Sequence, residues 1–189
     1  MSLQIADQYY LKAKSAMGGF CSDWGEVCEN LNYAVSHDET HCPSLTLLGK
    51  IYTEYLYDFD EGFTYFDAVI TANANYTDVY PKYIKALIWN DDLEKAQKLI
   101  DFSLTIKAID KASIYWLQAC ILEVKKEYKK GIKYLKEAKK ETYNNHFRDY
   151  LDDEKKRFKA KLETLKPKKK TSKKSKKTSK SKNKKKKII

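Results

Sequence analysis

The chain has 189 residues, of which 42% are hydrophobic, and it contains only 6 glycines and 3 prolines. A chain of this length and apolar content can build one folded domain, which excludes disorder throughout, and the scarcity of helix breakers favours long helices over a turn-rich β architecture. Residues 166–187 hold 14 lysines and no acidic residue, whereas the rest of the chain has 23 Lys and Arg against 26 Asp and Glu, so the net charge of +11 belongs to the tail. The folded part, at −3, is therefore not expected to attract phosphate in general.

The chain lacks the features of an exported or membrane-spanning protein. No stretch approaches 18 consecutive apolar residues, and residues 1–7 show no basic and apolar signal. We therefore expect no transmembrane segment and a cytoplasmic protein, or a nuclear one if the source is eukaryotic. In that setting the 4 cysteines are expected to be reduced thiols rather than a disulfide framework.

A repeat of about 35 residues runs through the chain. An aromatic residue or Leu is followed three residues later by a small or β-branched residue in four blocks, and the small residues are 35, 34 and 35 positions apart. The pairs are Trp24 and Val27, Phe59 and Gly62, Leu93 and Ala96, and Tyr128 and Gly131. Such constant spacing indicates a repeat architecture.

Each block continues as one apolar face of a helix. Four residues after the small residue of each pair comes a large apolar residue, and three residues later a smaller one. These residues are Leu31 and Ala34, Phe66 and Val69, Ile100 and Ser103, and Leu135 and Ala138. Spacings of three and four place these residues on a single helical stripe. Asp23, Asp58 and Asp92 stand where such helices begin, and Asp suits a helix start.

A second apolar run precedes each of these helices, so that each repeat is predicted to be a helical hairpin. The runs are Tyr9, Ala13 and Ala16; Leu45, Leu48, Gly49 and Tyr52; Tyr80, Tyr83, Ile84 and Leu87; and Tyr115, Ala119 and Leu122. We expect repeats over about 3–37, 42–75, 77–110 and 111–142. Relative to the others, the first block needs about two extra residues around Gly18, and the second needs one between Gly49 and Phe59.

This pattern resembles the tetratricopeptide repeat (TPR), a helical hairpin of about 34 residues. The fourth block matches it best, through Tyr115, Ala119, Leu122, Tyr128, Gly131, Leu135 and Ala138. The resemblance covers about residues 3–140 and implies an all-α superhelical solenoid of about four hairpins over residues 1–143. An irregular helical bundle with accidental periodicity is the alternative.

The end of the chain divides into a capping helix and a tail. Phe147, Tyr150, Leu151, Phe158, Leu162 and Leu165 mark one more amphipathic helix over 144–165, and a solenoid needs such a cap over its last repeat. Residues 166–189 have almost no apolar side chain to offset the entropy of ordering, so we predict that they are disordered.

The TPR resemblance implies a protein-interaction scaffold, or adaptor, that binds a partner segment in a concave groove. The first helix of each hairpin would line that groove, and aromatic residues there would anchor a peptide or helix. The candidate contact residues are Tyr10, Lys14, Met17, Thr46, Lys50, Thr53, Lys85, Ile88, Trp116 and Glu123.

The lysine tail gives an alternative function, RNA or DNA binding. Its candidate contacts are Lys168, Lys169, Lys170, Lys173, Lys174, Lys184, Lys185, Lys186 and Lys187. The tail has no Arg and no aromatic residue, so contact with nucleic acid or another anionic surface would be weak, non-specific and salt-dependent.

Two clusters suggest a metal site or an enzyme, but structural roles explain them better. Cys21, Cys28, His37, His41 and Cys42 could bind zinc, yet Cys21 and Cys28 are seven residues apart rather than in a tight Cys pair. The acidic residues at 58–61 and 91–92 suit helix caps, and no nucleophile or phosphate-loop motif occurs. We therefore predict no enzyme, no cofactor and no metal.

Overall fold

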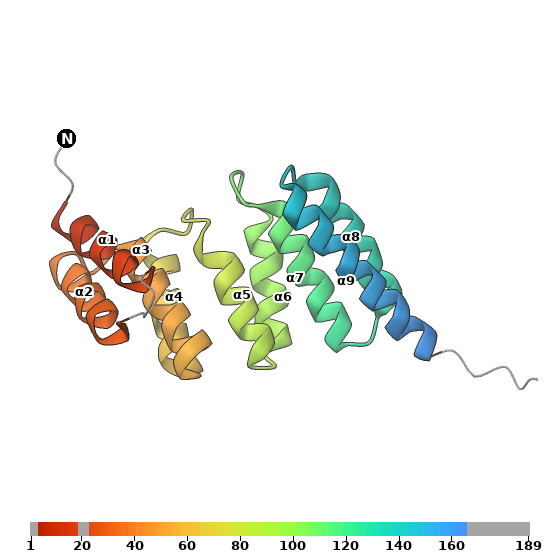
Figure 1. Cartoon of the computed structure of the whole chain (residues 1–189), viewed down its shortest axis with the longest axis horizontal. Helices are drawn as coiled ribbons and strands as arrows, with labels where there is room; N and C mark the ends of the chain where they lie inside the picture. Colours follow the sequence, from red (N-terminus) through yellow and green to blue (C-terminus); the bar gives the residue numbers. More distant parts are fainter. Residues whose placement is uncertain (1–3, 19–22, 166–189) are drawn as a thin grey trace, which may run out of the picture.

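The computed structural model describes residues 4–18 and 23–165, and within these ranges it contains helices and no strand. The helices are α1 (Ile5–Met17), α2 (Trp24–His37), α3 (Cys42–Ile51), α4 (Phe59–Ala72), α5 (Val79–Trp89), α6 (Leu93–Ser103), α7 (Lys111–Val124), α8 (Tyr128–Glu141) and α9 (Asn145–Thr164), with a short π-helix, Tyr52–Leu56, continuing α3. The most extensive packing joins neighbours in the chain, α1 with α2, α3 with α4, α5 with α6, α7 with α8 and α8 with α9. The hairpins stack in chain order, as Figure 1 shows, so the chain is an all-α helical repeat solenoid, as predicted.

Aspartate caps begin the second helices of the first three hairpins. The side chains of Asp23, Asp58 and Asp92 each accept a hydrogen bond from the backbone N–H three residues later, at 3.0, 3.1 and 3.0 Å. Helices α2, α4 and α6 begin at the residue that follows each cap. The acidic residues at 58 and 92 therefore cap helices, which confirms the structural interpretation of both.

The extra residue in the second repeat lies in the π-helix. Tyr57, Asp91 and Lys126 have φ values of 57°, 60° and 60° and occupy the same place in successive repeats, one residue before the second helix's N-cap. In the second hairpin the backbone N–H of Tyr57 donates to the Tyr52 carbonyl, five residues back. A π-turn takes up one residue more than an α-turn, so the inserted residue changes the helix locally and leaves the turn unchanged.

The predicted stripe of the second helices forms the core. The small residues and the two apolar positions that follow them are all buried, namely Val27, Leu31, Ala34, Gly62, Phe66, Val69, Ala96, Ile100, Ser103, Gly131, Leu135 and Ala138. The residue that opens each block is only partly buried or exposed, as Trp24 is, with 37% of its surface exposed. The core consists of three clusters, at α1–α4, at α3–α7 and at α7–α9, which share partly buried residues such as Trp116. Burial therefore runs from one hairpin to the next, as in repeat proteins generally.

The two helices of the second hairpin approach closely because glycines face each other. A Cβ atom at Gly49 would lie 2.7 Å from Cε1 of Phe66, and one at Gly62 would lie 2.4 Å from Cγ2 of Thr53. Neither distance leaves room for a methyl group. This close approach also buries Thr53.

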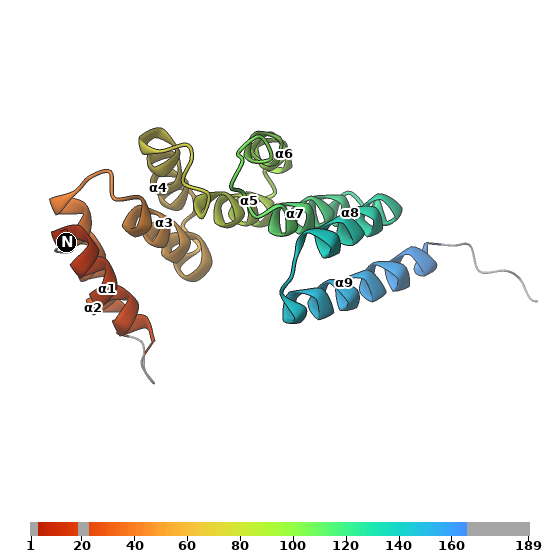
Figure 2. The same cartoon turned by 90° about the horizontal axis from the view of Figure 1, so that it is seen from above.

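Helix α9 has the sequence register of a first helix in a fifth repeat. Tyr150 follows Tyr115 by 35 residues, as Tyr115 follows Tyr80. Leu151 and Phe158 of α9 are buried against the last hairpin. Figure 2 shows α6 and α9 on opposite sides of the row formed by α5 and α7. Among the described helices, none has the length and apolar character to cross a lipid bilayer.

Candidate functional site

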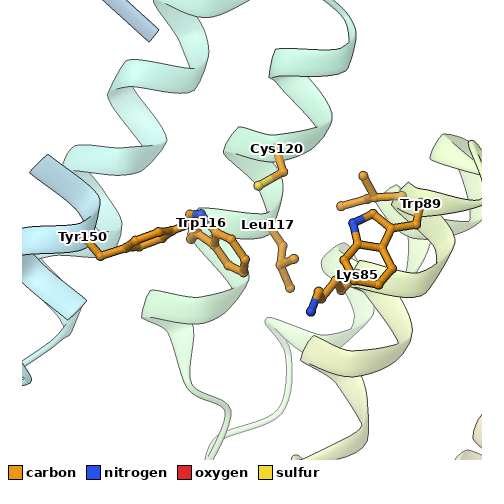
Figure 3. A pocket seen from close by; sticks show the side chains of 7 residues that line it. Lys85, Trp89, Trp116, Leu117, Cys120 and Tyr150 are labelled. Carbon is orange, nitrogen blue, oxygen red and sulfur yellow. The ribbon is translucent and has the colours of Figure 1, made fainter. Parts of the chain in front are cut away.

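A pocket of about 310 Å³ opens between α5, α7 and α9. Its lining residues are Lys85, Ile88, Trp89, Trp116, Leu117, Cys120 and Tyr150. Figure 3 shows Tyr150 extending from α9 toward Trp116, with Lys85 and Trp89 of α5 on the far side of Leu117. Three helices that are distant in sequence thus combine to form one largely apolar site.

Trp116 connects the pocket to the core. Its ring lies edge-on to Tyr150 at 5.9 Å and to Phe147 at 6.5 Å between ring centroids, and it packs against two of the three core clusters. Its buried indole N–H makes no hydrogen bond of normal geometry within the described part of the chain. Burial raises the pKa of the Tyr150 hydroxyl, and an interaction with this N–H offsets part of that rise.

Lys85 forms an ion pair at the pocket's edge. Its Nζ lies 3.1 Å from Glu54 Oε1 and 4.3 Å from the centroid of the Trp89 ring. Trp89 is 51% exposed although it is large and apolar. With Lys85 already paired, the pocket suits an apolar side chain better than an anion.

Cys120 is a poor nucleophile in this setting. Burial, followed by the nearby carboxylates of Glu154 and Glu123, raises its thiol pKa to about 12. The thiolate is the reactive form of cysteine, so Cys120 contributes an inert, weakly polar surface to the pocket.

Of the predicted contact residues, Lys85, Ile88 and Trp116 come together in this pocket. Thr46 and Thr53 do not line a groove, since they are only 2% and 1% exposed. The Thr53 hydroxyl donates to the Gly49 carbonyl at 2.8 Å inside the second hairpin. The expectation that both threonines are accessible to a partner is therefore wrong. The repeat pattern indicates which face of the helix a residue lies on, but it does not indicate how closely the neighbouring helix approaches that face.

Glu123 contacts α9 rather than open solvent. Arg157 Nη2 lies 2.9 Å from its Oε2 and Lys161 Nζ lies 2.6 Å from its Oε1. The capping helix therefore occupies the part of the surface where Glu123 was expected to meet a partner.

The remaining candidates lie in the first two hairpins, apart from the pocket. The Tyr10 ring lies edge-on to the His41 ring at 5.9 Å between centroids, and Lys14 Nζ is 5.6 Å from the centroid of the Tyr10 ring. Met17 is half-buried beside the core cluster of α1–α4, and Lys50 Nζ is 3.9 Å from Glu54 Oε2. Lys50 and Lys85 thus share one carboxylate.

Sequence reasoning missed Trp89, Leu117, Cys120 and Tyr150 as pocket residues. Tyr150 was assigned only to the apolar face of a cap. Trp89 lies one helical turn after Lys85, and Cys120 one turn after Trp116, so helical spacing from the candidates was the available signal.

The residues considered for metal binding have other contacts. His41 is buried, with Nδ1 2.8 Å from Ser44 Oγ and Nε2 3.2 Å from Asp7 Oδ1. His37 stacks on Tyr9 at 5.7 Å between ring centroids. Cys21 lies outside the described residues, and within them no group of three or more His, Cys, Asp or Glu residues could hold a metal ion. Cys28, Cys42 and Cys120 are free thiols.

The tail predictions fall outside the described residues. The lysines from Lys168 to Lys187, predicted to contact polyanions, and the disorder expected over 166–189 therefore stay predictions.

Comparisons with known proteins bear on the fold. No protein-family model matches the sequence, and no curated protein matches it. The chain is similar to the crystal structure of MamA, a TPR-like protein, with a TM-score of 0.55 and 13% identity over 87% of this chain and 98% of that chain. Together with the all-helical hairpins, this likeness supports a TPR-like helical repeat fold.

Proposed function

We propose that the protein is a scaffold that holds a segment of a partner protein against α5, α7 and α9, with a large apolar side chain in the pocket. One observation carries the proposal, the convergence of Trp89, Trp116 and Tyr150 on a single opening. Trp and Tyr dominate the binding energy of many protein interfaces, and apolar pockets with a few polar groups are the usual binding sites.

The state of the pocket residues supports a partner of this chemistry. Trp89 and Tyr150 are 51% and 44% exposed, so their apolar rings are accessible. Lys85 is held in place by its ion pair with Glu54 and is therefore not an unpaired charge that would select an acidic ligand. The proposal assigns no catalytic step to the pocket.

Site-specific photo-crosslinking tests this proposal in the full chain. A benzoylphenylalanine in place of Trp89 should capture a discrete partner in the source cells, at about 0.3 M salt to suppress contacts through the tail. The matched control places the same crosslinker at Tyr57, another exposed aromatic residue, which lies in the turn after the π-helix. Equal capture at both positions would contradict the pocket's role.

A second measurement uses the captured partner. Trp89→Ala should weaken its binding by about tenfold or more, as expected for a central aromatic contact, while Tyr57→Ala should leave binding unchanged. If deletion of residues 166–189 abolishes all binding at about 0.3 M salt while Trp89→Ala has no effect, the scaffold function is wrong and polyanion binding by the tail is the better explanation.

A further inference from the structure

Charge is strongly segregated within the part of the chain that precedes the tail. Residues 1–124 hold 9 Lys and Arg against 18 Asp and Glu, a net charge of −9, whereas residues 125–165 hold 14 against 8, a net charge of +6. The net charge of −3 is the sum of these two opposite parts, so the absence of a general attraction for phosphate does not exclude a local one at α8 and α9. A local concentration of positive charge attracts polyanions whatever the sign of the rest.

The positive charges of α8 and α9 meet in a cleft of about 350 Å³. Its lining residues are Lys136, Lys139 and Lys140 from α8 and Arg148 and Lys155 from α9. The two helices pack against each other, so the cleft has walls from both and is not a row of lysines along one helix.

Two of these five cations are already paired. Lys139 binds Asp152, and Lys140 Nζ lies 2.8 Å from Glu137 Oε1. Lys136 and Lys155 make no ion pair within residues 4–18 and 23–165. They are therefore available to an incoming anion.

Arg148 is fixed at the end of the cleft by the backbone. Its Nη1 donates to the carbonyls of Lys139 and Thr142, at 3.3 Å each, and its other nitrogens have no acceptor in the described part of the protein. A guanidinium held in this way is ready for a phosphate oxygen, because little further entropy is lost on binding.

An exposed aromatic residue follows directly after Thr142, whose carbonyl holds this arginine. Tyr143 follows Thr142 in the turn between α8 and α9 and is 96% exposed. A basic groove beside an exposed aromatic ring is the combination that binds single-stranded nucleic acid, since phosphates follow the groove and bases stack on the ring. A membrane surface would instead favour a broad apolar face, which Tyr143 alone does not provide.

We propose that the cleft between α8 and α9 binds single-stranded nucleic acid, with successive phosphates at Lys136, Arg148 and Lys155 and a base stacked on Tyr143. This site is separate from the apolar pocket of the proposed function. The tail supplies 14 further lysines directly after α9 in the sequence, so the test must distinguish the cleft from the tail.

Fluorescence anisotropy with a labelled oligouridylate of about 12 nucleotides, at about 0.15 M salt, makes that distinction in the full chain. The variant Lys136→Ala/Lys155→Ala should weaken binding by about tenfold and lower the salt dependence. The matched control, Lys98→Ala/Lys107→Ala, removes the same charge from exposed positions outside the cleft and should change affinity by less than about twofold. Equal losses in the two variants would overturn the proposal, because net charge and the tail would then explain the binding.

Tyr143→Ser tests the stacking contact. It should weaken oligouridylate binding by about tenfold but leave binding of inorganic polyphosphate, which has no bases, unchanged. Ultraviolet crosslinking of a 4-thiouridine oligomer should place the adduct at Tyr143. Loss of both ligands to the same extent would overturn the stacking role. Loss of binding to phosphatidylserine vesicles in the Lys136/Lys155 variant, with oligouridylate binding unchanged, would assign the cleft to lipid and overturn the proposal.

Discussion

Arg157 of α9 and Glu123 of α7 form a bidentate ion pair across 34 residues of sequence, with Nη2 2.9 Å from Oε2. The Glu123 side chain is only 15% exposed, and Lys161 adds a second contact at 2.6 Å to its Oε1. Two cations of the capping helix therefore converge on one carboxylate of the last hairpin. This network holds α9 beside the apolar pocket.

Glu123→Gln should loosen α9. The amide keeps the shape of the carboxylate but removes its charge, so Lys161 loses its ion pair and Arg157 keeps only Glu154, which lies on α9 itself. The free energy of unfolding should fall by about 1 kcal/mol, a value reduced because Arg157 is partly exposed. Urea unfolding measures the loss, and faster amide exchange in α9 would locate it. Lys156→Gln, which breaks an exposed pair with Asp153, is the control and should leave the free energy of unfolding almost unchanged. An equal effect of the two variants would contradict a structural role for the Arg157–Glu123 pair.

Gly131→Ala should displace α9 from α8 by steric conflict. A Cβ at Gly131 would lie 2.4 Å from Cε1 of Phe158, which is fully buried, so we expect a loss of about 1–3 kcal/mol in urea unfolding. Phe158→Leu removes the ring edge that causes the conflict. In a double-mutant cycle, the combined variant should therefore lose less stability than the sum of the single variants. Additive losses would show that Phe158 is not what excludes a side chain at 131.

Cys120 should resist alkylation in the native protein. With its pKa raised to about 12, only about one thiol in ten thousand is ionised at about pH 8, so iodoacetamide should react at least about a hundredfold more slowly than in the urea-unfolded chain. Mass spectrometry of tryptic peptides at timed intervals gives both rates. Rapid modification of native Cys120 would contradict its assignment as an inert wall of the pocket.

Stability should fall between about pH 10 and pH 12. Burial raises the pKa of both Tyr65 and Tyr76 to about 12, whereas an unfolded tyrosine ionises near pH 10. The native state then binds more protons than the unfolded state in this window, so the free energy of unfolding decreases as pH rises through it. Each tyrosine should contribute about 1 kcal/mol of this loss, well below the value that the full pKa difference implies, because both side chains are only partly buried and solvent screens their charges.

Urea midpoints at about pH 8 and pH 11 test this prediction. Tyr76→Phe removes the ionisable group and should reduce the fall between the two values. Tyr143→Phe is the matched control, because Tyr143 is almost fully exposed and its removal should leave the fall unchanged. Identical pH profiles in all three proteins would assign the alkaline loss to other groups.

Local periodicity determined the second helices of the hairpins. Spacings of three and four from Trp24, Phe59, Leu93 and Tyr128 gave their first residues and buried faces, because the apolar stripe of a helix depends only on its own sequence. The sequence also showed that the second repeat is one residue longer. The structure placed this residue in a π-helix, since backbone hydrogen bonds decide whether an insertion enlarges a turn or widens a helix.

The candidate site depended more on tertiary structure. The TPR resemblance implied that Lys85, Ile88 and Trp116 face a groove, and the structure brings them together in one pocket. Periodicity does not specify which helix covers a face or how closely it approaches. For that reason the burial of Thr53 and the pairing of Glu123 with α9 were not predictable.

The position of the last helix also could not be derived from periodicity. The sequence by itself determined an all-α repeat body, a final amphipathic helix and a separate lysine tail, because composition, charge and helical spacing are local properties. Only the tertiary structure decided that α9 packs between the apolar pocket and the basic cleft, lining one side of each. Packing between helices joins residues from different segments, and no spacing within one segment contains that information.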